Sequence, residues 1–80
     1  MGCGVSGGKI DKLVRMANQI GDYFNAMPDA EAVNGAADHL RLYWTPKMIG
    51  EIMHHVDSGG RGLNAVAGRA VTELKRRSNM

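Results

Sequence analysis

The chain has little of what a secreted or membrane-spanning protein requires. It holds one cysteine, Cys3, in 80 residues, which excludes an intramolecular disulfide and a multi-cysteine metal site. Its apolar runs fall far short of the roughly 18–20 residues of a membrane span. Its first ten residues lack the continuous apolar stretch of a signal peptide. We therefore expect a cytoplasmic protein with no membrane partner.

Aromatic residues are also scarce, since Tyr23, Phe24, Tyr43 and Trp44 are the only ones. A β-sandwich needs many aromatic and β-branched residues, whereas the abundant alanine and the six methionines favour helices. A chain of this length forms one small domain and has no room for a deep pocket between two subdomains.

What the sequence does contain is apolar residues at helical spacing. The spacing predicts an all-α fold, a small compact bundle of four short helices over residues 10–77, preceded by a flexible glycine-rich leader at residues 1–9. Pro28 should end the first helix after Met27, with Asp29 capping the second. Thr45 should cap the third helix, Ser58-Gly59-Gly60 should end it, and Asn64 should cap the fourth. The second helix should face inward with Val33, Ala36, Ala37, Leu40 and either Tyr43 or Trp44.

Each predicted helix contains an interior glycine: Gly21, Gly35, Gly50 and Gly68. A helical wheel places the last three away from the inward apolar arcs, so we do not expect them to mediate close packing inside the domain. Two interpretations remain open, a tolerated surface glycine or close approach by the backbone of another protein.

Motifs that would indicate an enzyme are missing. Residues 3–10 only faintly resemble a phosphate-binding loop, because Cys3 replaces its first glycine and Ile10 its Ser or Thr. His54 and His55 are adjacent, so they point about 100° apart on a helix and cannot share a metal ion. The pattern from Gly2 to Ser6 fits N-myristoylation but also an ordinary leader. We expect no catalytic, cofactor-binding or metal-binding residue in this chain.

Charge is distributed unevenly along the chain. Residues 1–60 carry five Lys or Arg and seven Asp or Glu, whereas residues 61–80 carry five and one. The basic end allows a small nucleic-acid-binding regulator, but it lacks an aromatic stacking platform. Charge complementarity to the end of the last helix explains the basic end without a nucleic-acid partner.

Four segments resemble one known family. Residues 12–20, KLVRMANQI, are similar to the opening helix of the delta subunit of soluble NAD-dependent formate dehydrogenases. Residues 37–40, ADHL, resemble its central helix, and residues 43–48, YWTPKM, its aromatic-Trp-x-Pro junction. Residues 59–63, GGRGL, resemble the glycine turn before its last helix. The resemblance covers roughly residues 10–75.

This resemblance implies a non-catalytic accessory subunit that binds the catalytic alpha subunit of a formate dehydrogenase and supports its stability or cofactor insertion. Partner subunits would carry molybdenum or tungsten bis(guanine dinucleotide), iron–sulfur clusters, FMN and NAD. Two alternatives stay open, a transient maturation chaperone for the alpha subunit and the nucleic-acid-binding regulator. Self-association of the isolated chain is open too.

Two surfaces are candidates for partner binding. On the first helix, four polar residues share an outward arc and offer directional hydrogen bonds: Arg15, Asn18, Gln19 and Asp22. The second candidate lies at the junction of the second and third helices: Trp44, Pro46 and Lys47. For Trp44, a position in the core between these helices is an equally good interpretation.

Overall fold

Four helices and no strand make up the part of the chain that the computed structural model describes, residues 8–78. They are α2 (Gly8–Phe24), α3 (Asp29–Tyr43), α4 (Pro46–Asp57) and α5 (Ala65–Ser78). The all-α class and the four-helix architecture are therefore confirmed. Most of the predicted leader, residues 1–7, lies outside the described residues, as do the whole myristoylation pattern and the first five residues of the phosphate-loop pattern.

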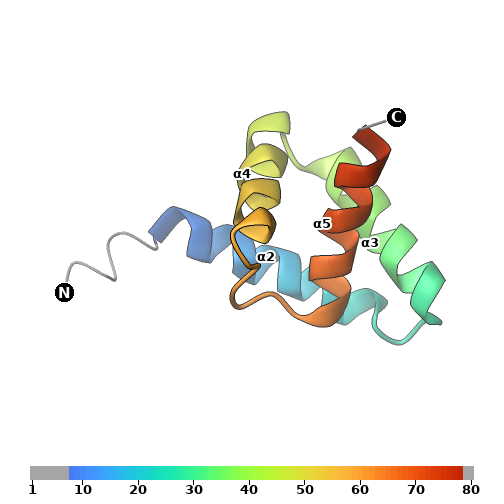
Figure 1. Ribbon diagram of the computed structural model, residues 1–80. Coiled ribbons are helices and arrows are strands. Elements are labelled where there is room, and N and C mark those ends of the chain that lie inside the picture. Colours follow the sequence, from blue (N-terminus) through green and yellow to red (C-terminus); the bar gives the residue numbers. More distant parts are fainter. Residues whose placement is uncertain (1–7, 79–80) are drawn as a thin grey trace.

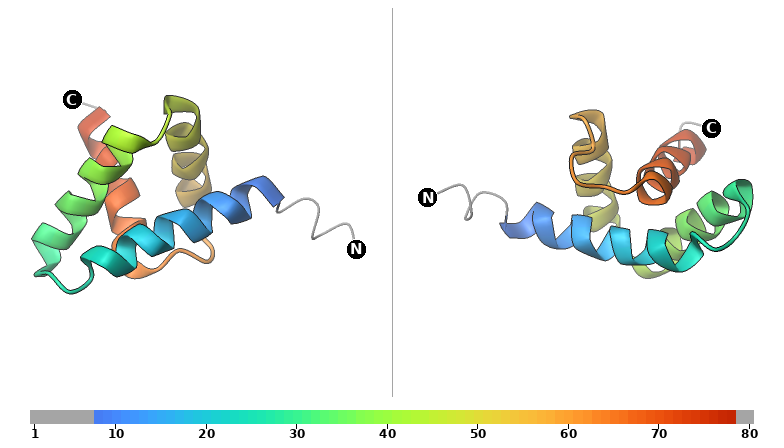
Figure 2. Two further views of the ribbon diagram at one scale, coloured as in Figure 1. Left: turned by 180° about the vertical axis from the view of Figure 1, so that it is seen from behind. Right: turned by 90° about the horizontal axis from the view of Figure 1, so that it is seen from below.

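The helices cross one another rather than lying parallel (Figure 1). α2 runs along one side of the molecule, and from behind α2 and α3 are seen to diverge from the loop that joins them (Figure 2, left). α5 contacts all three other helices, most extensively α3. The last helix therefore closes the core.

Two of the three predicted helix caps are confirmed. The Thr45 hydroxyl accepts a hydrogen bond from the backbone N–H of Met48 at 3.2 Å, and Pro46 follows at the first helical position. Asn64 Oδ1 accepts from the backbone N–H of Ala67 at 2.8 Å. Each side chain accepts a hydrogen bond from a backbone N–H of the first helical turn that has no partner within the helix.

The predicted cap at Asp29 is wrong. Pro28 occupies the N-cap position of α3, and no side chain makes a capping hydrogen bond there. Asp29 is the first helical residue, and its carboxylate accepts a hydrogen bond from Arg69 at 3.0 Å. α2 also ends earlier than expected, at Phe24, because residues 25–27 form a turn in which the Met27 N–H donates to the Phe24 carbonyl at 3.0 Å.

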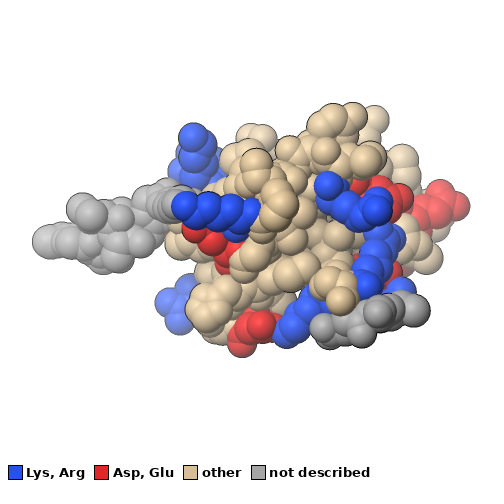
Figure 3. All heavy atoms as spheres, turned by 90° about the horizontal axis from the view of Figure 1, so that it is seen from above, with Lys and Arg blue, Asp and Glu red and all other residues tan. Residues whose placement is uncertain are grey.

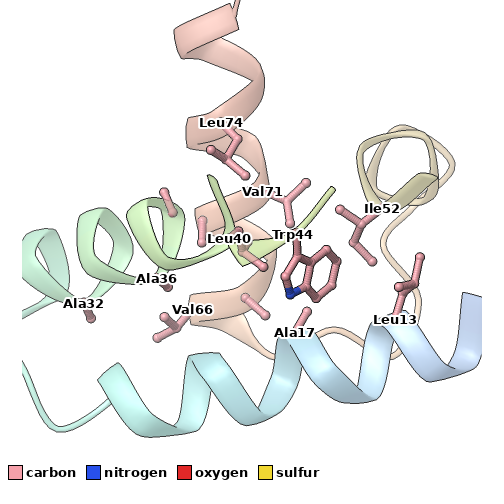
Figure 4. Packing of buried hydrophobic residues seen from close by; sticks show 13 residues of the cluster. Leu13, Ala17, Ala32, Ala36, Leu40, Trp44, Ile52, Val66, Val71 and Leu74 are labelled. Carbon is pink, nitrogen blue, oxygen red and sulfur yellow. The ribbon is translucent and has the colours of Figure 1, made fainter. Parts of the chain in front are cut away.

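The core is thin and rich in alanine, as Figure 4 shows. Leu40, Ile52 and Val71 are the largest side chains that are fully buried. The remaining buried hydrophobic residues are Leu13, Ala17, Ala32, Ala36, Ala37, Trp44, Val66, Ala67, Ala70 and Leu74. One expectation for α3 is corrected, since Ala32 belongs to this core instead of the half-exposed Val33. Of the two alternatives at its end, Trp44 points inward and Tyr43 is exposed.

Candidate partner-binding surface

The outward arc that the sequence predicts on α2 divides into two parts in the structure. Arg15 and Gln19 are exposed, and their side chains make no hydrogen bond or ion pair with the rest of the described chain. Asn18 and Asp22 face the loop between α4 and α5 instead. Of the four residues, only Arg15 and Gln19 keep their full hydrogen-bonding capacity for a partner.

Asn18 holds that loop against α2. Its Nδ2 donates to the Gly62 carbonyl at 2.9 Å, and its Oδ1 accepts from the Asn64 backbone N–H at 2.8 Å. In return, Asn64 Nδ2 donates to the Asn18 carbonyl at 3.1 Å and to Asp22 Oδ1 at 3.2 Å. We call Asn18 and Asn64 the asparagine pair. The expectation that Asn18 simply points outward is wrong, because this pair joins the start of α5 to the middle of α2.

Glycines allow the close approach that the asparagine pair needs. Gly62 has φ +86°, a backbone conformation that side chains with a Cβ rarely adopt. A Cβ at Gly21 would lie 2.6 Å from Asn64 Oδ1 and 3.1 Å from the Ala67 backbone nitrogen. Gly21 therefore lets the N-terminus of α5 rest on α2.

The second predicted surface loses one of its three residues. Trp44 is 7% exposed, and its side chain points into the core among Leu40, Ile52 and Ala17 (Figure 4). Of its two interpretations, the position in the core is therefore the correct one. Pro46 and Lys47 are exposed at the start of α4. Lys47 borders an open hollow of about 580 Å³ between α4 and Ile10 of α2.

The sequence reasoning missed a row of four rings, of which the two end rings are exposed and the two central rings half-buried. Tyr23, Phe24, His39 and Tyr43 contact one another in that order, with centroid distances of 5.0, 6.4 and 4.6 Å. We call these four residues the ring strip. Its existence depends on Gly35, where a Cβ would lie 2.7 Å from the Phe24 ring, so the expectation that Gly35 takes no part in close packing is wrong. The spacing of His39 and Tyr43 by one helical turn was the signal available in the sequence.

The basic end of α5 is neutralised by carboxylates of the same chain. Arg76 and Arg77 both donate to Glu73, Arg77 also donates to Asp38 at 2.8 Å, and Lys75 pairs with Asp57. Figure 3, seen from above, shows the interleaved basic and acidic side chains along the edge where α5 lies. Hydrogen bonds from Arg76 and then Arg77 lower the pKa of Glu73 to about 2.

Other types of site find little support in the described residues. No three or more His, Cys, Asp or Glu side chains of residues 8–78 lie close enough to hold a metal ion. His55 Nε2 is 2.7 Å from the Arg61 carbonyl oxygen, with which it shares a hydrogen bond. No helix of residues 8–78 has both the length and the apolar character that crossing a membrane requires.

Comparison with known proteins identifies the family. The family model described as NADH-dependent formate dehydrogenase delta subunit FdsD matches residues 12–71. No curated protein and no solved structure was found to match the chain. The matched segment includes the asparagine pair, the ring strip, all of α3 and α4, most of α2 and the first half of α5. The chain therefore belongs to the family of formate dehydrogenase delta subunits.

Proposed function

We propose that this chain is a non-catalytic accessory subunit that binds the catalytic alpha subunit of its formate dehydrogenase. The observation that carries the proposal is the family match over residues 12–71, three quarters of the chain. A subunit of this enzyme requires partner subunits, and the described surface offers polar groups suited to them. In the proposed assembly, the partners carry molybdenum or tungsten bis(guanine dinucleotide), iron–sulfur clusters, FMN and NAD.

The proposed mechanism is binding in fixed stoichiometry. A subunit that binds only one conformation of its partner stabilises that conformation by mass action. By covering a surface of the alpha subunit, the chain favours the form that is able to receive and hold its cofactor. The guanidinium group of Arg15 and the amide of Gln19 contribute directional hydrogen bonds to this contact.

Stoichiometry in the assembled enzyme tests the proposal. The chain is co-expressed with the other formate dehydrogenase subunits of its genome, the complex is purified through a tag on the alpha subunit, and native mass spectrometry counts the subunits. We expect the chain in the mature, cofactor-loaded complex. If it accompanies only the cofactor-free alpha subunit, it is a maturation chaperone. If it accompanies neither form, the proposal is wrong.

A double variant tests the α2 surface. Arg15→Ala with Gln19→Ala should weaken co-purification with the alpha subunit and leave the thermal melting of the free chain unchanged, because both side chains are exposed and neither makes a hydrogen bond or ion pair within the described chain. Arg41→Ala is the matched control, since Arg41 is exposed on α3 and has no side-chain partner in the described chain. Undiminished co-purification of the double variant would remove Arg15 and Gln19 from the interface.

A further inference from the structure

The exposed large hydrophobic residues of the described chain come from one segment of the sequence. They are Tyr23 (74% exposed), Met27 (41%), Leu42 (68%) and Tyr43 (72%). All four lie between the last turn of α2 and the last turn of α3. Tyr23 and Tyr43 are joined through Phe24 and His39 into one surface, and large apolar side chains that gather in this way, rather than being scattered singly, indicate an interaction site.

The ring strip within this region is held in place by the fold. Phe24 lies directly over Gly35, and its ring meets Tyr23 edge-on at an interplanar angle of 89°. His39 lies between Phe24, which it meets edge-on, and Tyr43, to which its ring is tilted by 42°. Because these contacts fix the rings before a partner arrives, little side-chain freedom is lost on binding. The hydroxyl groups of Tyr23 and Tyr43 have no hydrogen-bond partner in the described chain.

The ring strip is continuous with the polar surface on α2. Arg15, Gln19 and Tyr23 follow at intervals of four residues and therefore lie along the same side of the helix. Lys12 lies beside them, and neither Lys12 nor Arg15 has a carboxylate partner in the described chain. The combined surface is aromatic toward the end of α2 and cationic toward its start.

The charges of this surface specify its partner. Of the two carboxylates next to the ring strip in the sequence, Asp38 is paired with Arg77. Asp22 keeps its charge, since its partner Asn64 is a neutral amide, but it lies about 100° around α2 from Tyr23, on the side toward the loop before α5. The side of α2 that carries Tyr23 therefore presents rings and cations, which an apolar patch bordered by carboxylates would complement.

We propose that the ring strip, with Arg15 and Lys12 beside it, binds an apolar patch bordered by carboxylates on the alpha subunit of the formate dehydrogenase. Tyr23 and Tyr43 are the residues whose burial contributes most, since exposed tyrosines on rigid elements are typical binding hot spots. This inference rests on the function proposed above and adds the surface and the chemistry of its counterpart.

The test measures binding of the full-length chain to a formate dehydrogenase complex purified without it. Tyr23→Ser with Tyr43→Ser should weaken binding roughly thirtyfold, as expected when hot-spot side chains are truncated. Tyr23→Phe with Tyr43→Phe should retain most of the affinity, because the rings remain. Arg41→Ser is the matched control. Arg41 is exposed on the same helix as Tyr43, about 160° around it, so its replacement should not change binding.

The possible results separate the two proposals. If the unmodified chain does not bind the complex, the proposed function fails. If the unmodified chain and the double Ser variant bind equally well, only the ring strip is excluded. If the double Ser change abolishes self-association of the free chain in sedimentation experiments while binding to the complex persists, the ring strip is a contact between copies of this chain. A circular dichroism melt of each variant verifies that it is folded.

Discussion

Two neighbouring amides on α2 have opposite roles. Asn18 is half-buried and hydrogen-bonded to the loop before α5, whereas Gln19 is exposed and its side chain makes no hydrogen bond within the described chain. Asn18 makes hydrogen bonds with the backbone N–H of Asn64 and the backbone carbonyl of Gly62. Without Asn18, these two groups would have to form hydrogen bonds with water. A structural role and a binding role are therefore separated by one position in the sequence.

This difference predicts unequal effects on stability. Asn18→Ala should lower the free energy of unfolding by about 1–3 kcal/mol, because the partly buried N–H of Asn64 and the exposed carbonyl of Gly62 both lose their partner. Gln19→Ala should change it by less than about 0.5 kcal/mol, as surface substitutions usually do. Urea titrations followed by circular dichroism measure both values. Equal stability of the two variants would contradict the role assigned to Asn18.

The sequence could not separate these two amides. A helical wheel assigns Asn18 to the outward arc of α2, but its partners Gly62 and Asn64 lie 44 and 46 residues further along the chain. Periodicity reports only the apolar face of a helix, and no pattern within α2 indicates that a loop will fold onto its polar side. The same reason explains why the ring strip was missed, since the contact between Phe24 and Gly35 joins two helices.

The interior glycines also differ from one another. No atom lies within 4 Å of a Cβ placed at Gly50, whereas a Cβ at Gly21 would meet the N-terminus of α5. Gly50→Ala should therefore stabilise the fold by about 0.5–1 kcal/mol through helix propensity. Gly21→Ala should destabilise it, because the Ala67 backbone must move. Thermal melts of the two variants should shift in opposite directions, and a lower melting temperature for Gly50→Ala would show that the space beside Gly50 is not open.

At the scale of whole elements, the sequence predicted helix starts well where a side chain caps the helix. Thr45 and Asn64 cap α4 and α5 because their oxygens reach the free N–H groups of the first turn. Asp29 belongs to the same residue class, but it lies one position inside α3, after Pro28. Residue type alone does not distinguish the capping position from the first helical position, since acidic side chains are favourable at both.

The carboxyl group of Glu73, near the end of α5, should make the melting temperature of the protein depend on pH. Hydrogen bonds from Arg76 and Arg77 lower the pKa of Glu73 from 4.5 to about 2. A carboxyl group whose pKa is lower in the folded state stabilises the fold above its unfolded pKa and loses this effect as the pH falls toward the folded pKa. We therefore expect the melting temperature to fall between about pH 4.5 and pH 2.

The matching variant isolates this contribution. Glu73→Gln removes the titrating group, so its melting temperature should fall less steeply over the same range. Thermal melts at several pH values compare the two proteins. The variant should also be the less stable protein at neutral pH, where Glu73 is ionised. If the two curves run parallel below pH 4.5, Glu73 contributes nothing to the acid sensitivity.

At the scale of the whole molecule, the single tryptophan joins the helices. Trp44 directly follows α3 and points toward Leu13 and Ala17 of α2, Ile52 of α4 and Val71 of α5 (Figure 4). The sequence left a core and a surface position open for it, because Tyr43 and Trp44 are adjacent and only one of them can face inward. The choice depends on how α4 leaves the end of α3, which no local pattern encodes.

Trp44 should therefore report global unfolding. Because the indole is 7% exposed and contacts several helices, its fluorescence should shift to longer wavelength at the same urea concentration at which helical circular dichroism is lost. Trp44→Ala should cost about 3–5 kcal/mol, a large part of the roughly 4–12 kcal/mol expected for 80 residues. That loss should lower the melting temperature by more than about 10 °C. Two results would contradict the core position of Trp44 and favour its position on the binding surface. One is emission typical of an exposed indole in the native protein, and the other is a fluorescence midpoint that differs from the midpoint of the circular dichroism signal.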